Sequence, residues 1–187
     1  MNNSTMNTEE AYRLDIKLDI DSDQPVDPAP LIPIFHRWIQ NDHFQGDVLI
    51  DVADYRHVPD GPGVILVAYE AHLSVDFERG RPGLRYARKR PPVEKRDFGE
   101  LLRHDFSRAQ EAARLLQRES AFADGTRISD QRWTLKIQDR LRAPATDQAF
   151  EAVEPELRSF LSELYADDVQ VQRGGDTREG LTLRIEA

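Results

Sequence analysis

Residues 47–89 read DVLIDVADYRHVPDGPGVILVAYEAHLSVDFERGRPGLRYARK, and they hold the densest run of β-branched residues in the chain. Val48–Ala53 is a short apolar run and Val64–Phe77 a long one. The Pro- and Gly-rich segment between them is typical of a connection. Every odd-numbered position from residue 65 to residue 77 is apolar, which predicts one long strand whose odd positions all face the core.

The segment ERGRPG, residues 78–83, is typical of a turn and leads into a short strand over residues 84–88. A register that places Leu84 opposite Phe77 also places Arg85 opposite Asp76 on the polar face of the pair. We therefore expect two antiparallel strands here, with an ion pair between Arg85 and Asp76 that supports the register.

The rest of the chain contains segments with the apolar spacing of strands and segments with that of helices. Strict alternation of apolar and polar residues predicts strands, and apolar residues spaced three and four apart predict helices. Further strands are predicted over residues 12–20, 132–141, 169–173 and 181–185, and helices over 31–39, 97–122 and 148–165, the second of them capped by Asp97. This pattern predicts an α+β fold, a mainly antiparallel sheet with three helices.

The order strand, helix, strand, strand occurs in residues 12–77 and again in residues 133–185. An offset of 122 places Trp38 on Phe160, and an offset of 121 places Ile16 on Ile137. Generic amphipathic patterning would produce part of this agreement. A duplication is therefore one of two open interpretations. If it is real, two β-α-β-β units form one sheet or two packed halves, with the Asp97 helix as the connection.

The length and composition of the chain exclude several classes of protein. A chain of 187 residues can bury a core without metals or disulfides, and it contains no cysteine, which excludes thiolate sites and cysteine nucleophiles. The sequence shows no apolar run of membrane-spanning length and no apolar N-terminal leader. We expect a disordered tail over residues 1–11, a single cytoplasmic domain over residues 12–187, and no membrane partner.

The charge of the chain limits the classes of partner that it can bind. The net charge of −9, from 34 acidic and 25 basic residues, argues against nucleic-acid binding, since neutralising phosphates needs a basic surface. One segment opposes this overall charge, and its cations are Arg79, Arg81, Arg85, Arg88, Lys89 and Arg90. They are candidates to bind a phosphate, a carboxylate or an acidic protein surface. The alternative is that they pair with the chain's own Asp and Glu residues.

A second candidate site lies in the same stretch, and its polar residues are Asp51, Asp54, His57, Glu70 and His72. If Glu70 and His72 share one strand face, a carboxylate and imidazole cluster could form an acid/base pair or bind a metal. No spacing fixes a third ligand, so we expect no metal. Neither nucleotide-binding glycine motif occurs, and no serine lies in a nucleophile elbow.

The sequence thus favours a non-enzymatic binding or accessory protein that acts through a protein or anionic-ligand surface and needs no cofactor. A protein partner or a homo-oligomer is expected. The alternative is a small-molecule enzyme or ligand-binding domain with a polar pocket at the 51–76 hairpin.

Overall fold

The computed structural model describes residues 13–166, 168–174 and 180–187, and in them the chain forms eight strands and four α-helices. The strands are β1 (Leu14–Ser22), β2 (Leu49–Tyr55), β3 (Gly63–Ala68), β4 (Ala71–Asp76), β5 (Gly83–Arg88), β6 (Thr126–Ile137), β7 (Gln170–Gly174) and β8 (Thr182–Glu186). They form one antiparallel sheet in the order β2-β3-β4-β5-β1-β6-β8-β7. The predicted α+β fold is confirmed. The tail predicted over residues 1–11 lies outside the described residues.

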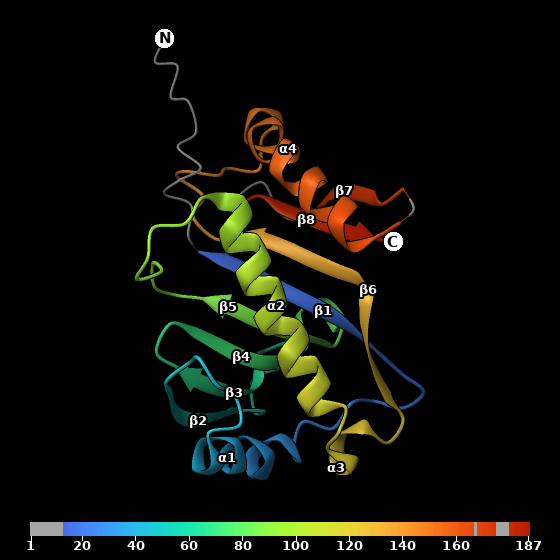
Figure 1. Cartoon of the computed structure of the whole chain (residues 1–187). Coiled ribbons are helices and arrows are strands. Elements are labelled where there is room, and N and C mark those ends of the chain that lie inside the picture. The colour runs from blue at the N-terminus through green and yellow to red at the C-terminus, as the bar shows by residue number, and fades with distance from the viewer. Residues whose placement is uncertain (1–12, 167, 175–179) are drawn as a thin grey trace.

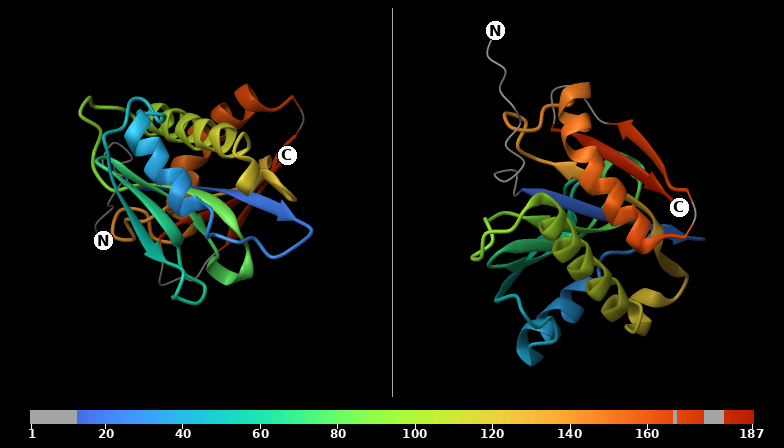
Figure 2. Two further views of the ribbon diagram at one scale, coloured as in Figure 1. Left: turned by 90° about the horizontal axis from the view of Figure 1, so that it is seen from below. Right: turned by 45° about the horizontal axis from the view of Figure 1, so that its top comes forward.

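The helices are α1 (Leu31–Asn41), α2 (Phe98–Leu116), α3 (Ser120–Ala123) and α4 (Asp147–Leu164). All four lie on one side of the sheet (Figures 1 and 2). Helix α1 packs on β2 and β3, and α2 crosses β5 and β1 and contacts α4. The other side of the sheet, called the open face below, carries no α-helix within the described residues.

Helix α2 begins as the sequence predicts. The Asp97 carboxylate accepts a hydrogen bond from the Glu100 backbone N–H at 2.8 Å, and the Glu100 carboxylate accepts one from the Asp97 N–H at 3.2 Å. This capping box satisfies two backbone donors at the helix start. The helix ends at Leu116 instead of continuing to residue 122, and the short α3 follows, so the structure has one α-helix more than expected.

Strand β1 shows how period-two patterning separates the two faces. Leu14, Ile16 and Leu18 are buried under the helices, whereas the side chains between them point to the open face. On the helix side, Phe106 of α2 packs against Trp133 of β6 with ring centroids 4.8 Å apart, and Phe160 of α4 contacts both. This cluster fixes α2 and α4 against the centre of the sheet.

The single long strand predicted over residues 64–77 is wrong. The chain turns at Tyr69 and Glu70, and β3 and β4 pair with each other as a hairpin. Consequently Val64 and Leu66 face the core in β3, while Val67 is only half buried. The odd positions face the core only from β4 onward. The odd and the even positions of β3 are both apolar, so the sequence pattern does not indicate which of the two sets faces the core.

The predicted register between β4 and β5 is wrong by two residues, because Leu84 lies opposite Val75 and not Phe77. The extra length is taken up by the 3₁₀ turn η2 (Glu78–Gly80). A shift of two residues keeps every side chain on its face. The ion pair between Arg85 and Asp76 therefore still forms, diagonally, at 3.3 Å.

The element order that suggested a duplication is present as β1-α1-β2-β3 and as β6-α4-β7-β8. In the sheet, β8 pairs with β6, the first strand of its own half, whereas β3 pairs with β2 and β4, and β1 pairs with β5, which lies outside the first half. A common origin of the two halves stays a prediction.

Candidate functional site

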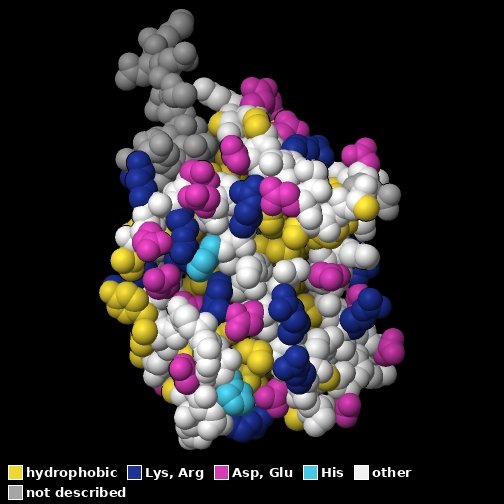
Figure 3. Space-filling model, in the orientation of Figure 1, with side chains coloured by type: hydrophobic (Ala, Val, Ile, Leu, Met, Phe, Trp, Pro, Cys, Tyr) yellow, Lys and Arg dark blue, Asp and Glu magenta, His cyan; other side chains and the backbone are white. Residues whose placement is uncertain are grey.

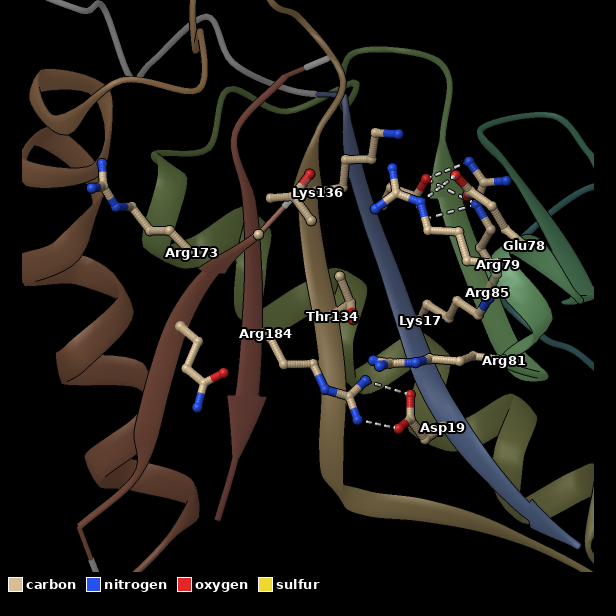
Figure 4. A pocket seen from close by; sticks show the side chains of 14 residues that line it. Lys17, Asp19, Glu78, Arg79, Arg81, Arg85, Thr134, Lys136, Arg173 and Arg184 are labelled. Carbon is tan, nitrogen blue, oxygen red and sulfur yellow. Dashed lines mark hydrogen bonds and ion pairs between the residues drawn. The ribbon is translucent and has the colours of Figure 1, made fainter. Parts of the chain in front are cut away.

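A cavity of about 410 Å³ lies on the open face, between the η2 turn on one side and the β7–β8 pair on the other. Figure 4 shows most of its side chains in front of the strands, with helices behind the sheet, whereas the Arg173 side chain points toward α4, where it pairs with Asp147. The cavity is lined by Asp15, Lys17, Asp19, Glu78, Arg79, Arg81, Arg85, Thr134, Lys136, Gln172, Arg173, Gly174, Thr182 and Arg184. We call it the sheet-face cavity.

The strand register places most of these side chains in two adjacent rows across the sheet. One row runs from β5 to β7 through Arg85, Lys17, Thr134, Arg184 and Gln172. The next row runs from β1 to β7 through Asp15, Lys136, Thr182 and Gly174. Neighbouring strands lie about 4.8 Å apart, so side chains from residues far apart in the sequence become direct neighbours.

Cations outnumber carboxylates in this cavity. Seven lining residues are Lys or Arg and three are Asp or Glu, in a chain whose net charge is −9. The helix-covered face looks different, because its basic and acidic side chains are interspersed (Figure 3). There Arg103 pairs with Glu163, and Arg37 pairs with Glu119.

Several of the cavity's cations are already paired with carboxylates of the sheet. The Arg85 Nε donates to both oxygens of Asp15 at 2.9 and 2.8 Å, and the same guanidinium reaches Asp76. Burial disfavours the charged form of Arg85, but Asp15 and then Asp76 outweigh it, so its pKa is raised. Lys17 pairs with Asp76. These ion pairs hold the charged side chains of β1, β4 and β5 in place at the base of the cavity.

Arg184 forms the other fixed pair. Its two terminal nitrogens donate to the two carboxylate oxygens of Asp19, one of them at 2.8 Å, and its Nε donates to Glu186 at 3.2 Å. Both members of the Arg184–Asp19 pair are mostly shielded from solvent. The pair therefore holds a guanidinium in one position on the β8 side of the cavity.

Arg81 differs from these residues. Its side chain points from the η2 turn across β1, in the direction of the Arg184–Asp19 pair (Figure 4). Among the residues that the structure describes, no carboxylate pairs with its guanidinium and no acceptor hydrogen-bonds to it. Arg79, two residues before Arg81, has φ = 60°, a conformation that costs a non-glycine residue about 1–3 kcal/mol. The turn that presents Arg81 is thus held in an unusual backbone conformation.

The structure divides the six basic residues predicted from the sequence into two groups. Arg79, Arg81 and Arg85 line the cavity. Arg88, Lys89 and Arg90 do not. The Arg88 side chain is fully buried on the helix side and bound to Asp105 and Glu70, so no surface ligand can reach it. Arg90 stacks over the Tyr69 ring, with Cζ 4.1 Å from the ring centroid. Lys89 is half buried beside it.

The five residues of the alternative site do not converge. Asp51 is exposed and accepts a hydrogen bond from the adjacent Val52 N–H. Asp54 pairs with Arg56, whose side-chain hydrogen bonds lower the pKa of Asp54 to about 2. His57 stacks on Tyr55 with ring centroids 6.2 Å apart. These contacts are local to β2 and the loop after it.

Glu70 and His72 do not share a strand face, because Glu70 lies in the β3–β4 turn and His72 lies in β4. Glu70 binds Arg88 at 2.9 Å, toward α2. His72 points to the open face, where its Nδ1 is buried without a hydrogen-bond partner among the described residues. Burial, and then the charges of Lys89 and Arg85, lower the pKa of His72. The carboxylate and imidazole cluster that the sequence suggested does not form.

Sequence reasoning missed most of the cavity, including Lys17, Thr134, Lys136 and Arg184. Each lies at a polar position of a strand whose alternate residues are buried. That alternation marks them as open-face residues. Only the strand order brings them together, and the order was not predicted.

No group of three or more His, Asp or Glu side chains in the described residues is arranged to hold a metal ion. None of the helices in this part of the chain is long and apolar enough to span a membrane. No protein-family model and no curated protein matches the sequence.

Proposed function

We propose that this protein binds a small anionic ligand in the sheet-face cavity, as a binding or accessory protein rather than as an enzyme. The observation that carries the proposal is the guanidinium of Arg81, which no carboxylate in the described residues neutralises, in a cavity where cations outnumber carboxylates. A planar guanidinium binds carboxylate or phosphate through two parallel hydrogen bonds.

The shape of the site favours a small ligand over a protein surface. The cations surround a cavity of about 410 Å³, which falls within the range of about 300–1,000 Å³ that small-molecule sites occupy. A second copy of the chain or an acidic partner would need a broad contact of about 1,000 Å² or more. The cysteine-free sequence is compatible with the reducing cytoplasm, where we propose that binding takes place.

The test is isothermal titration calorimetry with citrate and with inorganic pyrophosphate as probe anions, at low and at high salt. We expect binding that weakens as salt rises, because charge attraction is screened. Arg81→Gln should weaken binding about tenfold or more, since a hydrogen bond to a charged group contributes about 1.5–3 kcal/mol.

Arg90→Gln is the matched control. It removes one positive charge from the same basic segment, but outside the cavity. We expect this variant to bind both probes as the unmodified protein does. The proposal is overturned if neither anion binds, or if the Arg90 variant loses as much affinity as the Arg81 variant.

A further inference from the structure

The charge balance of the sheet-face cavity limits the charge of its ligand. Five of the seven lining cations contact a carboxylate: Lys17 contacts Asp76, Arg79 contacts Glu78, Arg85 contacts Asp15, Arg173 contacts Asp147 and Arg184 contacts Asp19. Lys136 lies opposite Asp15 in the strand register and is not free of partners either. Within the described residues, Arg81 is therefore the lining cation whose positive charge is left for a ligand.

Arg81 presents this charge over the central strands. Its side chain extends from the η2 turn across β1, and in the view of Figure 4 its guanidinium lies between the Thr134 side chain and the Arg184–Asp19 pair. Arg184 is already bound by both oxygens of Asp19 and by Glu186. The β8 side of the cavity thus offers no second cation, and one anionic group on the ligand is enough to match the site.

A carboxylate matches one guanidinium better than a phosphate ester does. Arg81 can donate two parallel hydrogen bonds to the two oxygens of a carboxylate, and the two unit charges then cancel. A phosphate ester carries a charge of about −1.5 to −2 at pH 7, so part of its charge would stay uncompensated in a cavity that also holds Asp19 and Glu78. The charge balance favours a ligand with a single carboxylate.

Uncharged polar groups lie beside Arg184 in the same row of the sheet. Thr134 of β6 and Gln172 of β7 are its two neighbours in the strand register. Neither the Thr134 hydroxyl nor the Gln172 amide makes a hydrogen bond with a described residue. Both groups can donate and accept, which suits hydroxyl groups of a ligand.

The lining offers no apolar surface to the rest of the ligand. Every lining residue is charged, polar or glycine, and no aromatic or aliphatic residue lines the cavity within the described part of the chain. Sites for ring systems and hydrocarbon chains use aromatic or apolar side chains. The body of the ligand is therefore hydrophilic as well.

We infer that the ligand of the sheet-face cavity is a hydroxylated monocarboxylate of the sugar-acid class, with its carboxylate bound to Arg81 and a hydroxyl group bound to Thr134. The inference rests on the proposed function, since it names the ligand class for the same site. A sugar acid meets both requirements, because it combines one carboxylate with a chain of hydroxyl groups.

The experiment compares four probes by isothermal titration calorimetry: gluconate, glucitol 6-phosphate, glucitol and hexanoate. Relative to gluconate, the second replaces the carboxylate by a phosphate, the third removes the charge and the fourth removes the hydroxyl groups. We expect gluconate to bind about tenfold more tightly than glucitol or hexanoate and about threefold more tightly than glucitol 6-phosphate. The assigned class is wrong if any of the other three binds as tightly as gluconate.

Variants of Thr134 test the hydroxyl contact separately from the charge. Thr134→Val keeps the shape of the side chain and removes its hydroxyl, so it should weaken gluconate about fivefold and leave hexanoate within about twofold. Thr134→Ser keeps the hydroxyl and is the matched control, with gluconate affinity close to that of the unmodified protein. Arg81→Gln should weaken both carboxylates, and melting curves show whether each variant is folded.

Failure of this inference is distinguishable from failure of the proposed function. Unchanged gluconate affinity in a folded Thr134→Val variant, or the absence of gluconate binding, overturns the sugar-acid class. In either case Arg81-dependent binding of citrate or pyrophosphate still upholds an anion site in the cavity. If none of these anions binds, both the ligand class and the proposed function are overturned.

Discussion

Arg88 on β5 and Asp105 on α2 form a two-point ion pair in which both side chains are completely buried, with nitrogen–oxygen distances of 2.9 and 2.6 Å. Glu70 adds a third contact to the same guanidinium. The pair joins the longest helix to the sheet from the side opposite to the cavity. It explains why an arginine in the basic segment is unavailable to a ligand.

Arg88→Met should lower the free energy of unfolding by about 3–5 kcal/mol, because it leaves the Asp105 carboxylate buried without a counter-charge. Arg103→Met is the control, since Arg103 pairs with Glu163 at the surface and its loss should cost about 1 kcal/mol or less. Urea denaturation of both variants measures the difference. Equal losses would show that the Arg88 pair is open to solvent.

The second prediction concerns the face of β3 that packs on the core. Leu66→Ala should cost about 2–5 kcal/mol, because Leu66 is fully buried under the helices. Val67→Ala should cost about 1 kcal/mol or less, since Val67 is half buried on the open face. Chemical denaturation of both variants measures these losses. A larger loss in Val67→Ala than in Leu66→Ala would show that Val67 faces the core, as in the continuous strand predicted from periodicity.

The sequence predicts most elements because local chemistry specifies them. Alternation identifies β1, and Asp97 with Glu100 identifies the start of α2. The β3–β4 turn escapes detection because Tyr69–Glu70 lacks the Gly or Asn that marks two-residue hairpins, and no positive φ is required there. Local patterning cannot reveal a turn that ordinary residues form.

The candidate site was predictable only in part, for a different reason. Arg85 and Arg88 are three positions apart in one strand, so period two already places them on opposite faces. Grouping them by charge alone obscured that difference. Arg184 lies far along the chain from Arg85, and only the order of strands in the sheet brings both to one cavity. Such long-range pairing is not encoded in any local pattern.

The third prediction is a pH dependence of stability from His72. Burial lowers the pKa of this imidazole below its ordinary value of 6.5, so the unfolded chain binds a proton more readily than the folded protein does. The stability associated with neutral His72 is present above pH 6.5 and is lost as the pH falls below that value.

His72→Gln should therefore lose less stability between pH 7.5 and pH 5 than the unmodified protein, as measured by urea denaturation at each pH. Titration of the His72 ring protons by nuclear magnetic resonance gives a direct check. A midpoint at or above 6.5 would contradict the structural environment assigned to this residue.

The last prediction links the packing of the sheet to the cavity through Gly83 of β5. A Cβ atom there would lie 2.6 Å from Lys17 Cε and 2.9 Å from the Leu18 carbonyl oxygen. The lysine side chain can move, but the backbone carbonyl cannot without disturbing the β1–β5 pairing. Gly83→Ala should therefore destabilise the fold by about 1–3 kcal/mol and displace Lys17 from Asp76.

Gly174→Ala provides the matched control on the other side of the same cavity. A Cβ atom at Gly174 would meet no heavy atom within 4 Å, and alanine restricts the unfolded chain more than glycine does. Its melting temperature should be unchanged or slightly raised, whereas that of Gly83→Ala should fall. If the two variants melt alike, Lys17 does not lie over Gly83, and the cationic row on the β5 side of the cavity is differently arranged.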